Sequence, residues 1–419
     1  MKKQGFLGQK LSTILIFSFL LLFGCKAEKN NEMDQAALPS FTAFQADIDF
    51  LKKHTDLVVL AEPSGKGMIA VSATLQGRVM TSSAAGLEGR SYGWINRALF
   101  ESGDTLDHMN PFGGEERFWL GPEGGQYAIF FKKGAPFDLD NWQTPRLIDL
   151  DAYEQVEKTA QKVVYRKKAT LTNYSNFTFD LAIERTIEVL SVAAVFQSLG
   201  LAEKEGLKVV GYRTTNTISN QGQEDWKKET GLLSIWLLGM FNPSDATTIV
   251  IPFEEGEDAQ LGPVVNDTYF GKVPSDRLKV GKGVLFFSGD GKYRSKIGLS
   301  PARAKNVAGS YDAKSQILTI VTYNKPDGES EYVNSLWEIQ DEPYQGDVIN
   351  AYNDGPPAPG KKPMGPFYEL ETSSPALALK VGESGTHIQQ TFHFEGAEAA
   401  LNEMAIQLLG VSLAEITAN

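Results

Sequence analysis

The sequence predicts an all-β protein, a large antiparallel sandwich with few peripheral helices. Three observations predict it: many short runs of apolar and β-branched residues, Gly, Asn, Asp and Pro turns between them, and only two segments with helical periodicity. The chain has 419 residues, of which 42% are hydrophobic and 22% charged, as in ordinary globular proteins. This length suits two average domains or one large all-β domain.

The clearest strand lies at 177–189, where apolar and polar residues alternate for thirteen positions. Period two over this length is typical of a strand with one buried face. Similar runs, separated by turn residues, predict further strands at 57–62, 68–75, 78–83, 126–131, 162–171, 207–218, 231–241, 247–253, 283–289, 316–324 and 387–394. Such a density of strands favours an antiparallel sandwich.

Two helices are predicted at the edges of this pattern. Near the end of the chain, Leu401, Met404, Ala405 and Leu408 follow the i, i+3, i+4, i+7 spacing, and Gly410 is a stop signal. Residues 41–54 predict an opening helix with one apolar face. Both helices are expected to pack on the sandwich rather than to bind a ligand.

The N-terminus has the pattern of a bacterial lipoprotein signal. Three lysines precede an apolar run of 14 residues at 11–24, which is too short for an ordinary membrane-spanning helix. Gly24 then precedes Cys25, the only cysteine of the chain, as in a lipobox. We therefore expect a signal peptide at 1–24, lipidation of Cys25 and membrane attachment through this lipid anchor.

Residues 25–40 are polar and predict a tether between the lipid and a single folded domain at 41–419. Lys26, directly after Cys25, favours the outer membrane as the location in the bacterial cell envelope. The formal net charge of −12 argues against nucleic acid as a partner, because phosphate contacts need a basic face.

The stretch GGEERFWLGPEGG at 113–125 places an arginine and a tryptophan among five glycines. If residues 116–120 are extended, Arg117 and Trp119 share one face. An exposed indole beside a guanidinium suits a sugar ring, with the ring stacked on Trp119 and its hydroxyls bound by Arg117. The alternative is a tryptophan buried in the core with Arg117 at its rim. We include the neighbouring Glu116 among the candidate binding residues.

Late acidic residues are candidates for general acid–base chemistry. Glu369 and Glu371 would share one face of a strand, where one carboxyl group serves as a general base and the other raises its pKa. Glu383 lies in a predicted turn and is a further candidate. Surface charges without a chemical role are the alternative for all three.

Candidate cations lie at Arg213, Arg294 and Lys296. A guanidinium suits sugar hydroxyls or a carboxylate, and a buried lysine can donate a proton. His387 lies on a polar face of the strand at 387–394 together with Gln389, Thr391 and His393, and this face could also be an exposed outer one. His387 and His393 lie too far apart along an extended strand, at about 20 Å, to form a metal site.

Three segments together resemble the galactose mutarotase-like superfamily, and most closely an uncharacterised group of bacterial lipoproteins within it. They are GGEERFWLGPEGG at 113–125, TGLLSIWLLGMF at 230–241 and GPFYELETSSPALALKVGESGTH at 365–387. The resemblance covers most of residues 41–416. It implies a β-supersandwich that binds carbohydrate in a concave face, and epimerase members use a Glu base and a His acid to interconvert anomers.

This chain departs from that pattern, because no histidine lies between His108 and His387. Glu369, Glu371 or Glu383 would be the base, and Lys296 or His387 the acid, since an arginine stays charged and is a poor proton donor. Three functions stay open: carbohydrate binding, an aldose epimerase-like isomerase, and a scaffold without a sugar site. We expect no cofactor, with a bound Ca²⁺ ion as the alternative.

Overall fold

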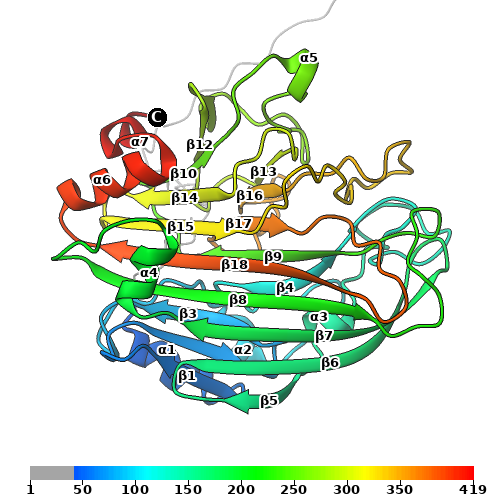
Figure 1. Ribbon diagram of the computed structural model, residues 1–419, viewed down its shortest axis with the longest axis horizontal. Helices are drawn as coiled ribbons and strands as arrows, with labels where there is room; N and C mark the ends of the chain where they lie inside the picture. Colours follow the sequence, from blue (N-terminus) through cyan, green and yellow to red (C-terminus); the bar gives the residue numbers. More distant parts are fainter. Residues whose placement is uncertain (1–41) are drawn as a thin grey trace, which may run out of the picture. The chain divides into compact units, whose positions relative to one another are not determined.

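A computed structural model describes residues 42–419, and all of them fall within one compact unit of the chain. The all-β antiparallel prediction is confirmed: within residues 42–419, 18 strands form three antiparallel sheets. The helices of this part of the chain are short (Figure 1). The predicted signal peptide, the lipidation site Cys25 and the tether lie outside the described residues. None of the helices between residues 42 and 419 is long and apolar enough to cross a membrane.

The elements follow one another along the chain with these bounds. The strands are β1 (Leu57–Ala61), β2 (Met68–Ser72), β3 (Arg78–Ser83), β4 (Arg117–Gly121), β5 (Glu154–Lys158), β6 (Lys162–Thr172), β7 (Thr178–Val189), β8 (Lys208–Asn220), β9 (Ser234–Phe241), β10 (Thr247–Pro252), β11 (Leu278–Val280), β12 (Val284–Ser288), β13 (Ser295–Leu299), β14 (Val307–Asp312), β15 (Ile317–Tyr323), β16 (Ile349–Asn353), β17 (Tyr368–Ser373) and β18 (Ser384–Glu395). The helices are α1 (Phe44–Leu51), α2 (Arg97–Ser102), α3 (Arg146–Asp149), α4 (Val192–Ser198), α5 (Asp258–Leu261), α6 (Glu398–Leu409) and α7 (Leu413–Ala418).

The strands form a ten-stranded, a five-stranded and a three-stranded sheet. The order of the largest is β11-β12-β10-β14-β15-β18-β8-β7-β6-β5, and that of the second is β13-β16-β17-β9-β4. Figure 1 looks onto the ten-stranded sheet, with β9 and β4 of the second sheet behind it. β1, β2 and β3 form the third sheet, and a single bridge between Val79 and Glu116 links it to the start of β4.

The main core lies between the two larger sheets, where alternate residues of each strand face inward. On β17 the inward residues are Tyr368, Leu370 and Thr372, and on β18 they include His387 and His393. In the five-stranded sheet β9 and β17 are buried along most of their length, and so is β15 in the ten-stranded sheet. The sandwich therefore buries polar as well as apolar side chains between its layers.

The predicted helices are confirmed, and the C-terminal one has a packing role. The apolar faces of α4, α6 and α7 cover the outer face of the ten-stranded sheet, where Phe392 and Phe394 of β18 contribute to a shared hydrophobic cluster. Gly410 ends α6 in a left-handed conformation, as its position in the sequence predicts.

The glycines of 113–125 shape the corner that leads into β4. Gly113 has φ of 94°, and a Cβ atom at this position would lie 2.0 Å from the carbonyl oxygen of Trp94. Only glycine combines this conformation with so close a backbone approach. Gly124 follows the other end of β4, and a Cβ atom at this position would lie 2.2 Å from the carbonyl oxygen of Leu336.

Replacing Gly113 with alanine is expected to lower the free energy of unfolding by about 1–3 kcal/mol, through backbone strain together with displacement of Trp94. Gly134 offers a matched control, because it has φ of 78° but nothing within 4 Å of the methyl group that alanine would add. Gly134→Ala should lose only the conformational part. Urea unfolding of both variants measures the difference, and equal losses would show that the contact with Trp94 adds nothing.

The predicted strand at 126–131 is wrong. This segment is a loop held by backbone hydrogen bonds from Ala128 to Gly125 and from Ile129 to Pro122. Four consecutive residues, 128–131, are buried, so their side chains do not alternate between two faces. Phe130 and Phe131 instead pack among aromatic side chains over the five-stranded sheet, which favours the loop over a strand.

Candidate functional site

The candidate site lies on the outward face of the five-stranded sheet. Because side chains alternate along β17, Glu369 and Glu371 point to this face while Leu370 and Thr372 point into the core. Lys296 on β13 pairs with Tyr352 of β16, which pairs in turn with Glu369, so all of these side chains lie on one face. The sheet thus gathers two acids and a lysine that are far apart in sequence.

Glu371 is the centre of the site. Its Oε2 atom accepts hydrogen bonds from Lys296 Nζ at 2.8 Å and from Trp236 Nε1 at 2.9 Å. Its Oε1 atom is buried and has no hydrogen-bond partner. A buried carboxylate oxygen without a donor is costly, so this atom is suited to accept a hydrogen bond from a ligand.

Glu123 follows the end of β4 and brings a further acid to Lys296 and Glu371. Burial of its carboxyl group raises the pKa of Glu123 to about 7, and the charge of Glu371 acts in the same direction. Lys296 and the indole N–H groups of Trp142 and Trp337 oppose this shift. A carboxyl group with a pKa near neutrality is suited to general acid–base chemistry.

Glu369 forms a buried ion pair with Arg117 on the same face. Burial raises the pKa of Glu369 to about 7, although Arg117 lowers it, and Glu371 raises it again. Asp354, which follows β16, has its pKa raised to about 6 by burial. The face therefore holds several acids that change charge near neutral pH, the kind of perturbed titration that clusters at functional sites.

Tyr269 and Asp347 border Lys296 from two loops. The Tyr269 hydroxyl donates a hydrogen bond to Asp347, and Asn350 of β16 donates to the Tyr269 oxygen at 3.1 Å. Burial raises the pKa of Asp347, while Tyr269 lowers it. Gly298 lies directly beneath, where a Cβ atom would be 2.1 Å from Asp347, so glycine allows this close approach.

Aromatic rings line the site around these charges. Lys296 Nζ lies 4.8 Å from the ring centroid of Trp236 and 5.5 Å from that of Tyr269. Trp142 and Trp337 stack with centroids 6.0 Å apart, and both come from loops that cover the sheet. Apolar walls with a few convergent polar groups are typical of small-molecule sites.

The family of this chain is shown by a match to a known family model. A model of a family of unknown function, DUF6786, matches residues 42–419. The chain belongs to the DUF6786 family. A search of curated proteins finds no match to it.

Among solved structures, this DUF6786 chain is similar to a putative aldose 1-epimerase from Escherichia coli K12, with 12% identity, TM-score 0.45 and coverage of 82% of this chain and 100% of the other. It is also similar to a galactose mutarotase-like protein from Lactobacillus casei, with 13% identity, TM-score 0.42 and coverage of 81% and 99%. An aldose epimerase homologue from C. elegans matches with 10% identity, TM-score 0.41 and coverage of 82% and 99%. Since these likenesses concern the fold, function has to be inferred from the side chains of the DUF6786 chain itself.

Five of the residues selected from the sequence gather on this face: Arg117, Trp119, Lys296, Glu369 and Glu371. The prediction that Trp119 is exposed is wrong, because only 3% of the residue is accessible. Its ring packs on Phe130 and on Trp236, 5.5 Å away from each, beneath the covering loop. Trp119 therefore packs beneath the covering loop, next to the site, and does not form an exposed surface for a ligand.

Three further candidates lie at or beyond the margin of the face. Arg294 stacks on Phe270 at 3.7 Å, next to the Tyr352 end of the face. Arg213 points away from the core on β8 and lies 4.0 Å from Glu188 on the neighbouring strand. Glu383 is exposed in the turn before β18, where it accepts a hydrogen bond from the backbone of Lys380. Arg213 and Glu383 thus lie at the surface, away from the Glu371 face, which corrects their predicted place in the site.

His387 and Glu116 are placed on the opposite side of the five-stranded sheet. Glu116 is fully buried between the sheets and pairs with Arg185 at 2.8 Å. His387 is also fully buried, and its Nε2 atom lies 2.8 Å from the hydroxyl of Thr372. Because Thr372 and Glu371 are successive residues of one strand, they face opposite ways, and His387 cannot reach the Glu371 site. Its predicted roles, as a catalytic acid or on an exposed face, are wrong.

The buried position of His387 predicts a pH dependence of stability. Burial lowers the pKa of His387 to about 3, so the unfolded state binds this proton at a higher pH than the folded state. Stability should fall as the pH drops from 6.5 toward 3, by about 1.4 kcal/mol per pH unit from this residue. Denaturant unfolding of wild type and His387→Gln between pH 4.5 and 6.5 measures the difference, and parallel profiles would contradict it.

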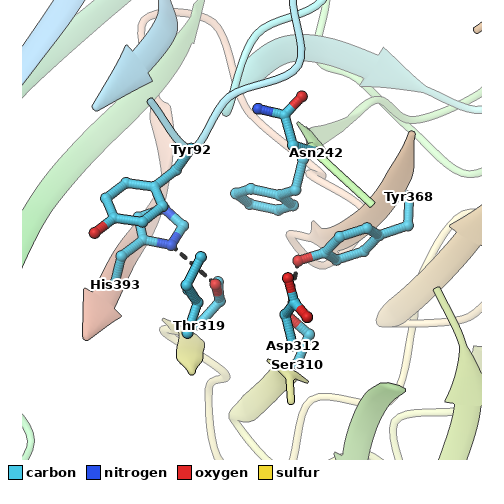
Figure 2. A pocket seen from close by; sticks show the side chains of 9 residues that line it. Tyr92, Asn242, Ser310, Asp312, Thr319, Tyr368 and His393 are labelled. Carbon is cyan, nitrogen blue, oxygen red and sulfur yellow. Dashed lines mark hydrogen bonds between the residues drawn. The ribbon is translucent and has the colours of Figure 1, made fainter. Parts of the chain in front are cut away.

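A second polar cluster between the sheets encloses a small cavity of about 20 Å³ (Figure 2). Thr319 lies 2.9 Å from His393 Nδ1, Tyr92 stacks on the imidazole, and the other ring nitrogen lies 3.2 Å from Glu115. This volume holds about one water molecule. The cavity is too small for a sugar.

Sequence reasoning missed Glu123, Trp236, Tyr269 and Asp347. All but Trp236 come from loops, and no periodicity marks a loop residue as a neighbour of a strand. Glu123 carried a signal, since it stands between Pro122 and two glycines in the stretch singled out at 113–125. Among residues 42–419, no group of three or more His, Cys, Asp or Glu side chains is arranged to hold a metal ion.

Proposed function

We propose that this protein is a lipid-anchored protein of the bacterial cell envelope that binds carbohydrate at the Glu371 site, in glycan capture or processing. The observation that carries the proposal is the Glu371–Lys296 pair with its unpartnered Oε1 atom, enclosed by aromatic rings. Sugar hydroxyls both donate and accept hydrogen bonds, so they can satisfy the free carboxylate oxygen. Indole rings offer apolar surface to the C–H faces of a sugar.

Calorimetry of the purified protein with a panel of mono- and oligosaccharides tests this proposal. At least one sugar should bind. Glu371→Gln should weaken the affinity for that sugar by roughly tenfold or more, because an amide carries no charge to pair with Lys296. Glu331→Gln is the control, since Glu331 forms an exposed ion pair with Lys228 elsewhere on the surface. Absence of binding across the panel would favour the scaffold function instead.

A second function, an aldose epimerase-like isomerase, is favoured by one observation. Glu123 and Glu369 both have pKa values raised to about 7 beside Glu371, as an acid–base mechanism at neutral pH requires. NMR exchange spectroscopy on each bound sugar measures anomer interconversion. Exchange faster than in buffer, and lost in Glu123→Gln with binding kept, would support the enzyme; exchange at the buffer rate would leave a binding protein.

The membrane anchor is tested separately through Cys25. The wild-type protein should fractionate with membranes and incorporate a labelled fatty acid, whereas Cys25→Ser should do neither. Recovery of unlabelled wild-type protein in the soluble fraction would contradict the anchor. Separation of inner and outer membranes then tests the proposed outer-membrane location.

A further inference from the structure

A groove of about 360 Å³ lies at one end of the ten-stranded sheet, where β7 begins and β8 ends. These strand ends lie side by side, toward the right in Figure 1. Their pairing stops at Leu181 and Asn220, so residues 178–180 of β7 extend beyond it, and the chain continues after β8 as the loop 221–226. The groove shares no residue with the Glu371 site, and its volume falls within the range of about 300–1,000 Å³ that small-molecule sites occupy.

Several polar side chains of this groove have unused hydrogen-bonding groups. Within residues 42–419, the side chains of Asn176, Gln223 and Glu224 line the groove, are exposed and make no hydrogen bond or ion pair. Asp180 accepts a hydrogen bond from Thr170 at 2.6 Å through Oδ1 and leaves Oδ2 free. Two amides and two carboxyl groups together offer a ligand both donors and acceptors.

Phe177 adds an apolar surface to the groove. Its ring packs edge-on to Phe179 with the centroids 4.9 Å apart, and Phe179 packs edge-on to the buried Trp226 at 5.1 Å. These contacts hold the Phe177 ring in place, while part of the residue stays accessible in the groove. An aromatic ring beside hydrogen-bonding side chains is suited to a ligand that has both C–H groups and hydroxyls.

The charges of the groove favour a neutral ligand. Among the described residues that line it, Asp180 and Glu224 are acids and none is a lysine, arginine or histidine. A carboxylate or phosphate would therefore meet like charges, which is unfavourable. A neutral sugar avoids this repulsion, and its hydroxyls can donate to the carboxyl groups and both donate to and accept from the amides.

We propose that this groove is a second binding site, separate from the Glu371 site, and that it takes a neutral sugar unit. The C–H groups of the sugar lie against Phe177, and its hydroxyls bond to Asn176, Gln223 and the two carboxyl groups. Because the two sites share no residue, this proposal does not depend on the function proposed for the Glu371 site.

Calorimetry of the full protein with glucose, galactose, mannose, N-acetylglucosamine and their β-linked disaccharides tests the proposal. The groove variant combines Asn176→Gly with Gln223→Ala, and glycine suits position 176 because Asn176 has φ of 72°. At least one sugar should bind the groove variant at least about tenfold more weakly than wild type, because two hydrogen-bonding side chains are lost. Glu371→Gln should change the affinity for that sugar less than about twofold.

Gln316→Gly combined with Gln197→Ala is the matched control. Gln316 also has a positive φ, 52°, and lies in an exposed turn between β14 and β15, while Gln197 is exposed on α4. Neither residue lines the groove, so this control should bind the sugar as wild type does. Thermal unfolding of each variant establishes that it is folded.

The outcomes separate this proposal from the one for the Glu371 site. If sugar binding responds to Glu371→Gln and not to the groove variant, the groove proposal is wrong and the Glu371 site stands. If it responds to the groove variant alone, the groove stands and the Glu371 proposal is wrong. If no sugar binds, both are wrong. Titration with CaCl₂ that gives heat where no sugar does, and that the groove variant abolishes, would show a cation site and overturn the sugar site.

Discussion

Arg185→Met is expected to lower the free energy of unfolding by about 3–5 kcal/mol. Arg185 and Glu116 are both fully buried between the two large sheets, and Arg185 Nη2 donates to Glu116 at 2.8 Å. Burial already raises the pKa of Glu116 to about 7, and Arg185 is the main group that opposes this rise. Without Arg185, the protein must bury an unpaired carboxylate or protonate it.

Chemical denaturation at pH 8, where an unfolded glutamate is ionised, measures this loss. Arg166→Met is the matched control, because Arg166 forms an exposed ion pair with Glu184 on a neighbouring strand and should cost under about 1 kcal/mol. Adding Glu116→Gln to Arg185→Met should recover stability, since the amide keeps its bonds to Thr214 and Gln389 without a charge. Similar losses in the two single variants would contradict the assigned role of the pair.

Lys296→Met should have the largest effect on the candidate site. Lys296 holds Glu371 through its hydrogen bond and lowers the pKa of both Glu123 and Glu369. Its loss should raise the pKa of Glu123 above about 7 and weaken binding of the sugar ligand at least about 30-fold, because one partner of a nearly buried charge pair is removed. Carboxyl ¹³C NMR titration and calorimetry measure the two effects.

Lys272→Met is the control for this experiment. Lys272 forms an ion pair with Asp267, but 75% of its side chain is exposed, so its loss should leave both the titration and the binding unchanged. If Lys296→Met behaves like Lys272→Met, Lys296 contributes nothing to the site. If the titration moves without a change in affinity, the ligand binds elsewhere.

The class of fold could be predicted because alternation is a local property. The thirteen residues at 177–189 show their two faces in the sequence, and β7 is found at Thr178–Val189 with the same buried positions. The strand predicted at 126–131 is wrong because a local pattern does not show contacts with distant segments. Its apolar residues look like a strand, but they are buried by aromatic side chains from a distant loop that contains Trp337.

The site could be predicted only in part. Alternation on β17 correctly placed Glu369 and Glu371 on one face, and that on β4 placed Arg117 with Trp119. The sequence alone does not show which face of each of these strands packs in the core and which face is covered by loops. His387 and Glu116 have the residue types of a site, but register across the sheets places them inside the sandwich.

The sequence by itself determined the all-β class, the helix that ends at Gly410, the acidic pair of β17 and the turn-rich corner around β4, because each depends on neighbours within a few residues. The tertiary structure alone decided that Lys296 lies 2.8 Å from Glu371, that Glu123 joins them, and that Trp142 and Trp337 adjoin Glu123. Strand order and loop placement set these contacts. Burial, which shifts the pKa values, exists only once distant segments have packed together.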